Sequence, residues 1–150
     1  MAAFPEHRMS IITLGVKDRA AMTAWYTDVL GFQNFGPEGI TMFDMGGFVF
    51  GLWENDKLAD DAGQPLGEQS GFKGVALAFN ARSEAEVDAI FAALEAADGA
   101  TITKAPHKAF WGGYSGYFAD PEGNAWEVAF NPFWGIADDG QLKLPKAEGA

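Results

Sequence analysis

The chain contains no cysteine among its 150 residues. This absence excludes disulfide bonds, thiolate-ligated zinc, iron–sulfur clusters and a cysteine nucleophile. No apolar stretch approaches the roughly 20 residues that a membrane-spanning helix needs, because Gly, Lys, Asp or Glu interrupts each one. The N-terminal residues also lack the basic and apolar regions of a secretory signal. Together these absences predict a cytoplasmic protein.

Positively charged residues are scarce. Lys and Arg number 10 against 21 Asp and Glu, which gives a formal charge of -11 at pH 7. Such a charge repels phosphate backbones and anionic lipid surfaces, so we predict no nucleic-acid partner and no membrane partner. The acidic excess has two interpretations: it solvates the surface, or it attracts a cationic ligand.

The remaining composition is that of a globular domain. Hydrophobic residues make up 48% of the chain and charged residues 21%, which excludes a largely disordered protein. A chain of this length has room for one ordinary domain, or for two very small modules that share a core. We therefore interpret residues 1–150 as a single domain.

The first half of the chain predicts one strand, one helix and three further strands. Residues 11–16 have the apolar character of a strand, and the helix after them is predicted to end at Gly31, which suits the left-handed C′ position. Short strands are predicted at 32–35, 40–44 and 47–54, separated by glycine-containing turns. The helix is predicted from apolar residues at helical spacing: Met22, Trp25, Tyr26, Val29 and Leu30.

The second half repeats this order after a polar, glycine-containing stretch, residues 56–71, which we predict to be a linker. A strand at 73–79 precedes a helix that opens with Ser83 and Glu86, a pair able to form a capping box, and that ends at Gly99. The strands predicted after this helix are 100–103, 114–119 and 124–130, with a hairpin turn at 120–124.

The two halves can be overlaid on one another. Leu14 lies 63 positions before Leu77, and Gly51 lies 76 positions before Glu127. We predict an internal duplication in which loops absorb the increase in offset. The predicted parts are module 1 at about 9–55, the linker at about 56–71, module 2 at about 72–132 and a C-terminal tail at 133–150. We expect the apolar start of this tail to fold back over a sheet or a partner subunit.

Two motifs carry a family resemblance. The stretch ITLGVKD followed by WYTDVLGF, within residues 12–32, and the stretch WGGYSGYFADPEGNAWE at 111–127 resemble the opening and closing signatures of vicinal oxygen chelate proteins. That superfamily includes glyoxalase I, bleomycin-resistance proteins, fosfomycin-resistance enzymes and extradiol dioxygenases. The resemblance implies an α+β fold of two tandem βαβββ modules, whose curled mixed sheets surround a shared cavity, and it implies a homodimer.

Strand alternation predicts which residues face that cavity, because successive side chains point to opposite faces of a sheet. Small residues dominate the predicted cavity face, which is either open or filled by another backbone. The side chains predicted to pack against helices are Ile12, Leu14, Val16, Phe48, Phe50, Leu52, Val75, Leu77, Phe79, Trp126, Val128 and Phe130. Those predicted to face the cavity are Ile11, Thr13, Gly15, Val49, Gly51, Trp53, Gly74, Ala76, Ala78, Ala125, Glu127 and Ala129. Trp111, Tyr114 and Trp134 are expected near its rim.

The resemblance also implies where a metal would bind. Metal-using relatives take His or Glu ligands from four symmetric strand positions, which correspond here to Ile11, Gly51, Gly74 and Glu127. Glu127 alone can coordinate a metal, and one carboxylate does not hold a divalent ion against water. We therefore predict no metal and no other cofactor. The alternative is an atypical divalent-metal site that joins Glu127 to His7 and His107.

These residues lead to a prediction of metal-independent binding of a small organic molecule, planar or amine-bearing, in the cavity between the modules. Glu127 would anchor an amine or hydroxyl of the ligand. The alternative is an enzyme of the same superfamily, a lyase, isomerase or dioxygenase, with Glu127 as the catalytic base or as a metal ligand. Two further alternatives stay open: Glu127 only accepts hydrogen bonds from its neighbours, or the cavity is vestigial in a structural or regulatory protein.

Overall fold

The computed structural model describes residue 3 and residues 5–145. The chain forms two compact units, Met1–Gly67 and Glu68–Ala150. The boundary between them falls inside the predicted linker, residues 56–71. In the described part of the chain, no helix has both the length and the apolar character needed to cross a membrane.

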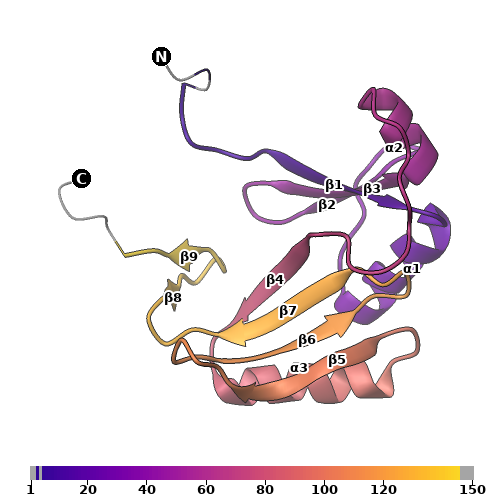
Figure 1. Cartoon of the computed structure of the whole chain (residues 1–150). Helices are drawn as coiled ribbons and strands as arrows, with labels where there is room; N and C mark the ends of the chain where they lie inside the picture. The colour runs from indigo at the N-terminus through magenta and orange to yellow at the C-terminus, as the bar shows by residue number, and fades with distance from the viewer. Residues whose placement is uncertain (1–2, 4, 146–150) are drawn as a thin grey trace. The chain divides into compact units, whose positions relative to one another are not determined.

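The first unit is a three-stranded mixed sheet with two helices (Figure 1). Its sheet has the order β1-β3-β2, in which β1 runs parallel to β3 and β2 runs antiparallel to it. The elements are β1 (Ile11–Val16), α1 (Arg19–Leu30), β2 (Thr41–Asp44), β3 (Val49–Glu54) and α2 (Asn55–Asp61).

Helix α1 has the boundaries that local capping chemistry predicts. At its start, the Asp18 carboxylate accepts a hydrogen bond from the Ala21 N–H at 2.9 Å. At its end, Gly31 adopts φ 76°, and its N–H donates to the Thr27 carbonyl at 3.1 Å. The predicted helix end at Gly31 is confirmed. The buried face of α1 packs Tyr26 against the rings of Phe43 and Phe50.

The second unit repeats this strand order and adds one strand, β5, at the edge of a four-stranded sheet. Its order is β4-β7-β6-β5, with β4 parallel to β7 and the other pairs antiparallel. Helix α3 lies along one face of this sheet (Figure 1) and packs mainly on β5 and β7. The elements are β4 (Ala76–Ala81), α3 (Glu84–Ala96), β5 (Thr101–Lys108), β6 (Tyr114–Ala119), β7 (Ala125–Phe130), β8 (Gly135–Ile136) and β9 (Leu142–Lys143). The α+β class and the tandem modules are confirmed.

The predicted helix cap and hairpin turn of the second unit are also confirmed. Ser83 caps α3 by accepting a hydrogen bond from the Glu86 N–H at 3.1 Å, while the Glu86 carboxylate accepts one from the Arg82 N–H at 2.5 Å. In the predicted hairpin turn, the buried Asp120 carboxylate accepts bonds from the backbone N–H and the side-chain amide of Asn124, at 2.9 and 2.8–3.0 Å. The turn therefore has a structural role.

Several predicted boundaries are wrong. The strand expected at 32–35 is reduced to a single bridge between Asn34 and Phe43, because the Asn34 side chain itself accepts the Met42 N–H at 3.0 Å. The linker begins with α2, where neither Gly nor Pro interrupts residues 55–61. The tail forms a small hairpin of β8 and β9, whose Ile136 and Ala137 carbonyls accept bonds from the Arg82 guanidinium.

The overlay of the two modules needs a correction of two residues. Strands β1 and β4 have equal lengths and start 65 positions apart, and the N-caps Asp18 and Ser83 are separated by the same 65 positions. Strands β3 and β7 are 76 positions apart, as predicted. The counterpart of Ile11 is therefore Ala76 and not Gly74.

Candidate functional site

The sheet of the second unit has one face covered by α3 and one face turned away from it. Tyr114 and Gly116 identify the covered face: the Tyr114 hydroxyl donates to Asp88 of α3 at 2.6 Å, and a Cβ on Gly116 would meet the Phe91 ring. Strand alternation then places Ser115, Tyr117 and Ala119 on the opposite face, which we call the open face. Cross-strand partners lie on the same face, so the register extends this assignment to β4, β5 and β7.

The central row of the open face contains a carboxylate, a phenol and an ammonium group. Tyr117 on β6 is the register partner of Glu127 on β7 and of Lys104 on β5. On its other side, Glu127 pairs with Ala78 of β4. Both Glu127 and Tyr117 are half-buried, whereas Lys104 is exposed.

Tyr117 and Glu127 interact directly across the two strands. The pKa of Tyr117 is raised, first by burial, then by its hydrogen bond to the Glu127 carboxylate and by the negative charge of that carboxylate. The phenol therefore stays protonated at neutral pH and acts as the donor to Glu127. One carboxylate offers several lone pairs, so this bond leaves Glu127 able to accept a second donor.

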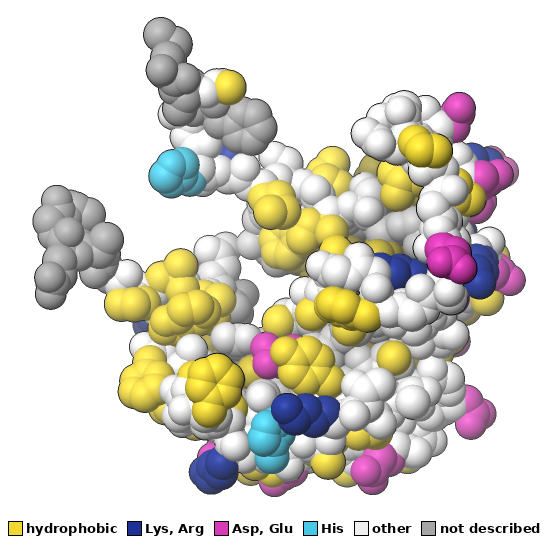
Figure 2. All heavy atoms as spheres, viewed as in Figure 1, with side chains coloured by type: hydrophobic (Ala, Val, Ile, Leu, Met, Phe, Trp, Pro, Cys, Tyr) yellow, Lys and Arg dark blue, Asp and Glu magenta, His cyan; other side chains and the backbone are white. Residues whose placement is uncertain are grey.

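A second row lies beside the first. His107 on β5 is the partner of Ser115, which pairs with Ala129 of β7, and Asn80 of β4 completes the row. The His107 Nδ1 lies 3.2 Å from the Ala105 carbonyl, which leaves Nε2 as its other polar atom. Figure 2 shows a histidine, a basic and an acidic side chain grouped on the surface of this sheet.

Irregular pairing in β5 produces this arrangement. The register of β5 against β6 shifts between Ile102 and Lys104 and again between Lys104 and His107. Each shift inserts a residue and re-aims the side chains that follow it. As a result, two polar side chains of β5 share a face with Tyr117 and Ser115. His107, named above for an atypical metal site with His7 and Glu127, belongs to this strand.

The corresponding face of the first unit is less polar. Its sheet places five predicted residues on one face, and Gly51 is the partner of Thr13. A Cβ on Gly51 would make ordinary contacts at 3.4 Å with the Thr13 hydroxyl and the Thr41 carbonyl. Gly15 is no cavity residue, because Asn55 of α2 would lie 2.5 Å from its Cβ. The five residues are Ile11, Thr13, Val49, Gly51 and Trp53.

Other predicted positions also need correction. Gly74 precedes β4 and has φ 79°, so strand alternation does not assign it a face. Tyr114, expected near the rim of the cavity, lies on the face that α3 covers. Trp111 is half-buried in the β5–β6 loop, where its ring covers Gly113. Phe79, predicted to pack under the helix, is 46% exposed because β4 is an edge strand.

Two further predicted core residues are exposed. Val75 lies before β4 and is 51% exposed, and Phe48 lies before β3 and is 38% exposed. Both precede the strand to which alternation assigned them, so the sheet does not hold them against a helix. Leu77, Trp126 and Val128 are half-buried or buried, in agreement with the helix-packing prediction.

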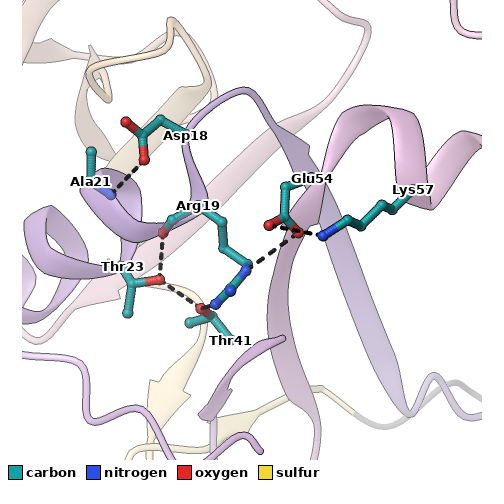
Figure 3. A network of polar contacts seen from close by, with 7 residues as sticks. All are labelled: Asp18, Arg19, Ala21, Thr23, Thr41, Glu54 and Lys57. Carbon is teal, nitrogen blue, oxygen red and sulfur yellow. Dashed lines mark hydrogen bonds and ion pairs between the residues drawn. The ribbon is translucent and has the colours of Figure 1, made fainter. Parts of the chain in front are cut away.

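The first unit contains a polar network that the sequence did not reveal (Figure 3). Arg19 Nε lies 3.4 Å from Glu54 Oε2, and Lys57 Nζ lies 3.4 Å from Glu54 Oε1. Arg19 also donates to the Thr41 hydroxyl at 3.3 Å, and the Thr41 and Thr23 hydroxyls are 2.6 Å apart. This network joins α1, β2, β3 and α2, and we interpret it as structural.

Local donors and charges stabilise the ionised form of Glu54. Its pKa is lowered, first by a hydrogen bond from its own backbone N–H, and further by a hydrogen bond and the charge of Lys57 and the charge of Arg19. Partial burial of the side chain opposes this shift. Glu54 is therefore an ionised partner of Arg19 at neutral pH.

Comparison with known proteins places this fold in a family. The model of the Glyoxalase/Bleomycin resistance protein/Dioxygenase superfamily matches residues 8–128. The chain belongs to this superfamily. A glyoxalase-related enzyme from Fulvimarina pelagi is 34% identical, with a TM-score of 0.83, over 94% of this chain and 100% of that one.

Two further solved structures of this superfamily resemble the chain. An enzyme of the glyoxalase/bleomycin resistance protein/dioxygenase family from Burkholderia phytofirmans PsJN is 28% identical, with a TM-score of 0.69, over 81% of this chain and 96% of its own. A lactoylglutathione lyase from Agrobacterium tumefaciens is 27% identical, with a TM-score of 0.68, over 89% of this chain and 100% of its own. The comparison with curated proteins gave no match.

The metal site expected from the superfamily resemblance does not fit the residues present. With the corrected overlay, the four symmetric positions are Ile11, Gly51, Ala76 and Glu127, and the first three side chains carry no donor atom. Over residue 3 and residues 5–145, no three His, Asp or Glu side chains come together in a way that would hold an ion. His7 precedes β1 in the first unit, whereas His107 lies in the second.

Sequence reasoning missed Ser115 and Tyr117 as candidates, and it gave no reason to prefer Lys104 to other surface lysines. Alternation along β6 is the signal that places Ser115 and Tyr117 on the face of the sheet opposite to that of Tyr114. Lys104 lacked such a signal, because the shifts in β5 register decide which way it faces. The open face of the second unit, built around Glu127, is the candidate site.

Proposed function

We propose that this protein binds a small organic molecule on the open face of its second unit without a metal ion. One observation carries the proposal. Of the four symmetric positions, Glu127 alone has a donor atom, and it is hydrogen-bonded to the Tyr117 phenol. A half-buried carboxylate held by a neutral donor is suited to accept a hydroxyl or an amine from a ligand.

The surroundings of Glu127 support binding of a flat molecule. Its neighbours on β4, β6 and β7 are mostly alanines. Their short side chains leave room for a ligand above the sheet on either side of the row. Tyr117 adds an aromatic ring, and an offset stack on such a ring contributes about 0.5–1.5 kcal/mol beyond burial. These alanines are Ala76, Ala78, Ala119, Ala125 and Ala129.

The test is ligand-induced stabilisation of the full chain after treatment with a chelator. Aromatic and cationic compounds are screened by thermal unfolding, and a binder at 100 times its Kd stabilises the fold by about 2.7 kcal/mol. Glu127→Gln should abolish this stabilisation, whereas Glu95→Gln, an exposed position on α3, should leave it intact. The absence of any binder in the panel would overturn the proposal.

A second candidate function is proton transfer by an enzyme of this superfamily. The phenol–carboxylate pair of Tyr117 and Glu127 favours it, because such a pair can accept and return a proton. A lyase is also represented among the similar structures. Under this alternative, Glu127→Gln abolishes turnover and leaves the fold intact. Full activity of that variant would remove Glu127 from the mechanism.

We also propose that the protein is a cytoplasmic homodimer. Several large apolar side chains of the second unit are exposed, and large exposed apolar surface is typical of protein interfaces. Light scattering on the purified chain measures the mass directly, and a monomer at micromolar concentration would contradict the dimer. The most exposed of these side chains are Phe72, Phe110, Phe133 and Leu144.

A further inference from the structure

The central row of the open face has opposite charges at its two ends. Glu127 lies on β7, Lys104 lies on β5, and the neutral Tyr117 lies between them. Building on the proposed function, we propose that the ligand carries a carboxylate at one end and a protonated amine or a hydroxyl at the other. Lys104 binds the carboxylate, and Glu127 accepts the hydrogen bond of the amine or hydroxyl.

Lys104 is available for this role. Three other basic residues of the second unit are already engaged: Lys73 with Asn124, Arg82 with carbonyls of the β8–β9 hairpin, and Lys108 with Glu84. The Lys104 ammonium group has no hydrogen bond or ion pair with any side chain or carbonyl of the residues that the structure describes. In a chain of net charge -11, a lysine on the open face without an acidic partner is suited to bind an anion.

Glu127 is available as an acceptor at the other end. The Tyr117 phenol occupies part of its hydrogen-bonding capacity and adds no charge to the row. A carboxylate that keeps a free lone pair binds an ammonium group through a charge-assisted hydrogen bond, which is about twice as strong as a neutral one. The row therefore favours a ligand whose positive end meets Glu127 and whose negative end meets Lys104.

The spacing of the strands sets the length of the ligand. Neighbouring strands lie about 4.8 Å apart, so the backbones of β7 and β5 are about 10 Å apart across β6. A molecule whose charged groups sit on one carbon is too short to reach both Glu127 and Lys104. A flat spacer between the two groups fits over Tyr117, the residue between them.

The probe that tests this inference is para-aminomethylbenzoate, which has an amine and a carboxylate at opposite ends of one ring. Its two halves, para-methylbenzylamine and para-methylbenzoate, each lack one of the groups. Titration of the isotope-labelled full chain, followed through amide NMR shifts, gives the Kd of each. We expect the zwitterion to bind about tenfold more tightly than either half.

Two lysine variants locate the carboxylate. Lys104→Met should weaken binding of the zwitterion about three- to tenfold and leave binding of para-methylbenzylamine unchanged. Lys108→Met is the matched control, because it removes the same charge from the same strand on the α3 face, where Lys108 pairs with Glu84. This control should not alter the affinity for the zwitterion.

The outcomes separate this inference from the proposed function. Equal affinity for the zwitterion and for para-methylbenzylamine, or an unchanged Kd in Lys104→Met, overturns the inference and leaves the proposed function standing. If none of the three probes binds while another compound of the panel does, the inference is likewise overturned and the proposed function still stands. Failure of every compound in the panel overturns the proposed function itself.

Discussion

Tyr117 and Glu127 are cross-strand partners on β6 and β7, and the phenol of the first donates a hydrogen bond to the carboxylate of the second. The same carboxylate occupies the last of the four symmetric positions of the duplicated fold. A neutral side chain thus partners Glu127, and the candidate site depends on this pair.

Replacing Glu127 should change how Tyr117 titrates. The pKa of Tyr117 lies above its ordinary value of 10.0 because of burial, the hydrogen bond to Glu127 and the negative charge of Glu127. Glu127→Gln removes the charge, so the pKa should fall while burial keeps it above 10.0. Tyrosine-labelled NMR through the alkaline range measures this shift directly.

Tyr114 provides the internal control for that titration. Its pKa is raised chiefly by its hydrogen bond to Asp88, on the other face of the sheet. It should be the same in the wild type and in Glu127→Gln. A Tyr117 pKa that does not move would show that the two residues are not coupled.

Replacing Glu54 should lower stability in a pH-dependent way. Because the pKa of Glu54 is lowered from 4.5 in the folded state, its stabilising contribution is present above pH 4.5 and is lost as pH falls through the folded value. Glu54→Gln should therefore be less stable than wild type at neutral pH. This difference should shrink in acid.

Urea unfolding at neutral pH and at about pH 3.5 measures both differences. Glu38→Gln, an exposed carboxylate of the same unit, serves as the comparison and should be nearly neutral at either pH. A stability loss in Glu54→Gln that is equally large in acid and at neutral pH would contradict the Arg19–Glu54–Lys57 network.

Gly116 should not tolerate a side chain. A Cβ at this position would lie 2.7 Å from the Phe91 ring and 2.8 Å from the Lys104 carbonyl. Gly116→Ala should destabilise the fold by about 1–3 kcal/mol and disturb the strand that carries Lys104. Gly51→Ala meets its neighbours only at 3.4 Å and should cost less than about 1 kcal/mol.

Thermal unfolding of both alanine variants gives the comparison. Equal stability of Gly116→Ala and Gly51→Ala would mean that β5 does not approach β6 as closely as described. An amide NMR spectrum of Gly116→Ala should also show its changes concentrated in β5 and β6. Uniform changes throughout the chain would indicate general unfolding instead.

Much of the fold could be predicted because its signals are local. The end of α1 at Gly31, the cap at Ser83 and the turn at 120–124 each depend on residues only a few positions apart. Alternation likewise assigned Glu127 to the face opposite Trp126 and Val128, which are buried. These features require no knowledge of how distant segments pair.

The overlay of the modules failed for a physical reason. Strand side chains alternate with a period of two, so a shift of two residues keeps every apolar residue on the same face. Leu14 therefore matched Leu77 as readily as its true counterpart, Phe79. The helix caps Asp18 and Ser83 have no such ambiguity, and their separation of 65 positions would have decided the register.

The site itself could be predicted only in part. Glu127 was found from its strand, whereas Lys104 and His107 reach the open face through register shifts in β5 that leave no clear pattern in the sequence. The Arg19–Glu54 pair joins residues 35 positions apart along the chain. Such pairing is a property of the folded sheet and is not visible in local periodicity.

Native mass spectrometry of the full chain, purified without a chelator, tests the central claim most directly. The account predicts that the protein carries no stoichiometric metal ion and gains the mass of an organic ligand, a gain that Glu127→Gln abolishes. One divalent ion per chain, retained in the wild type and lost in Glu127→Gln, would contradict it.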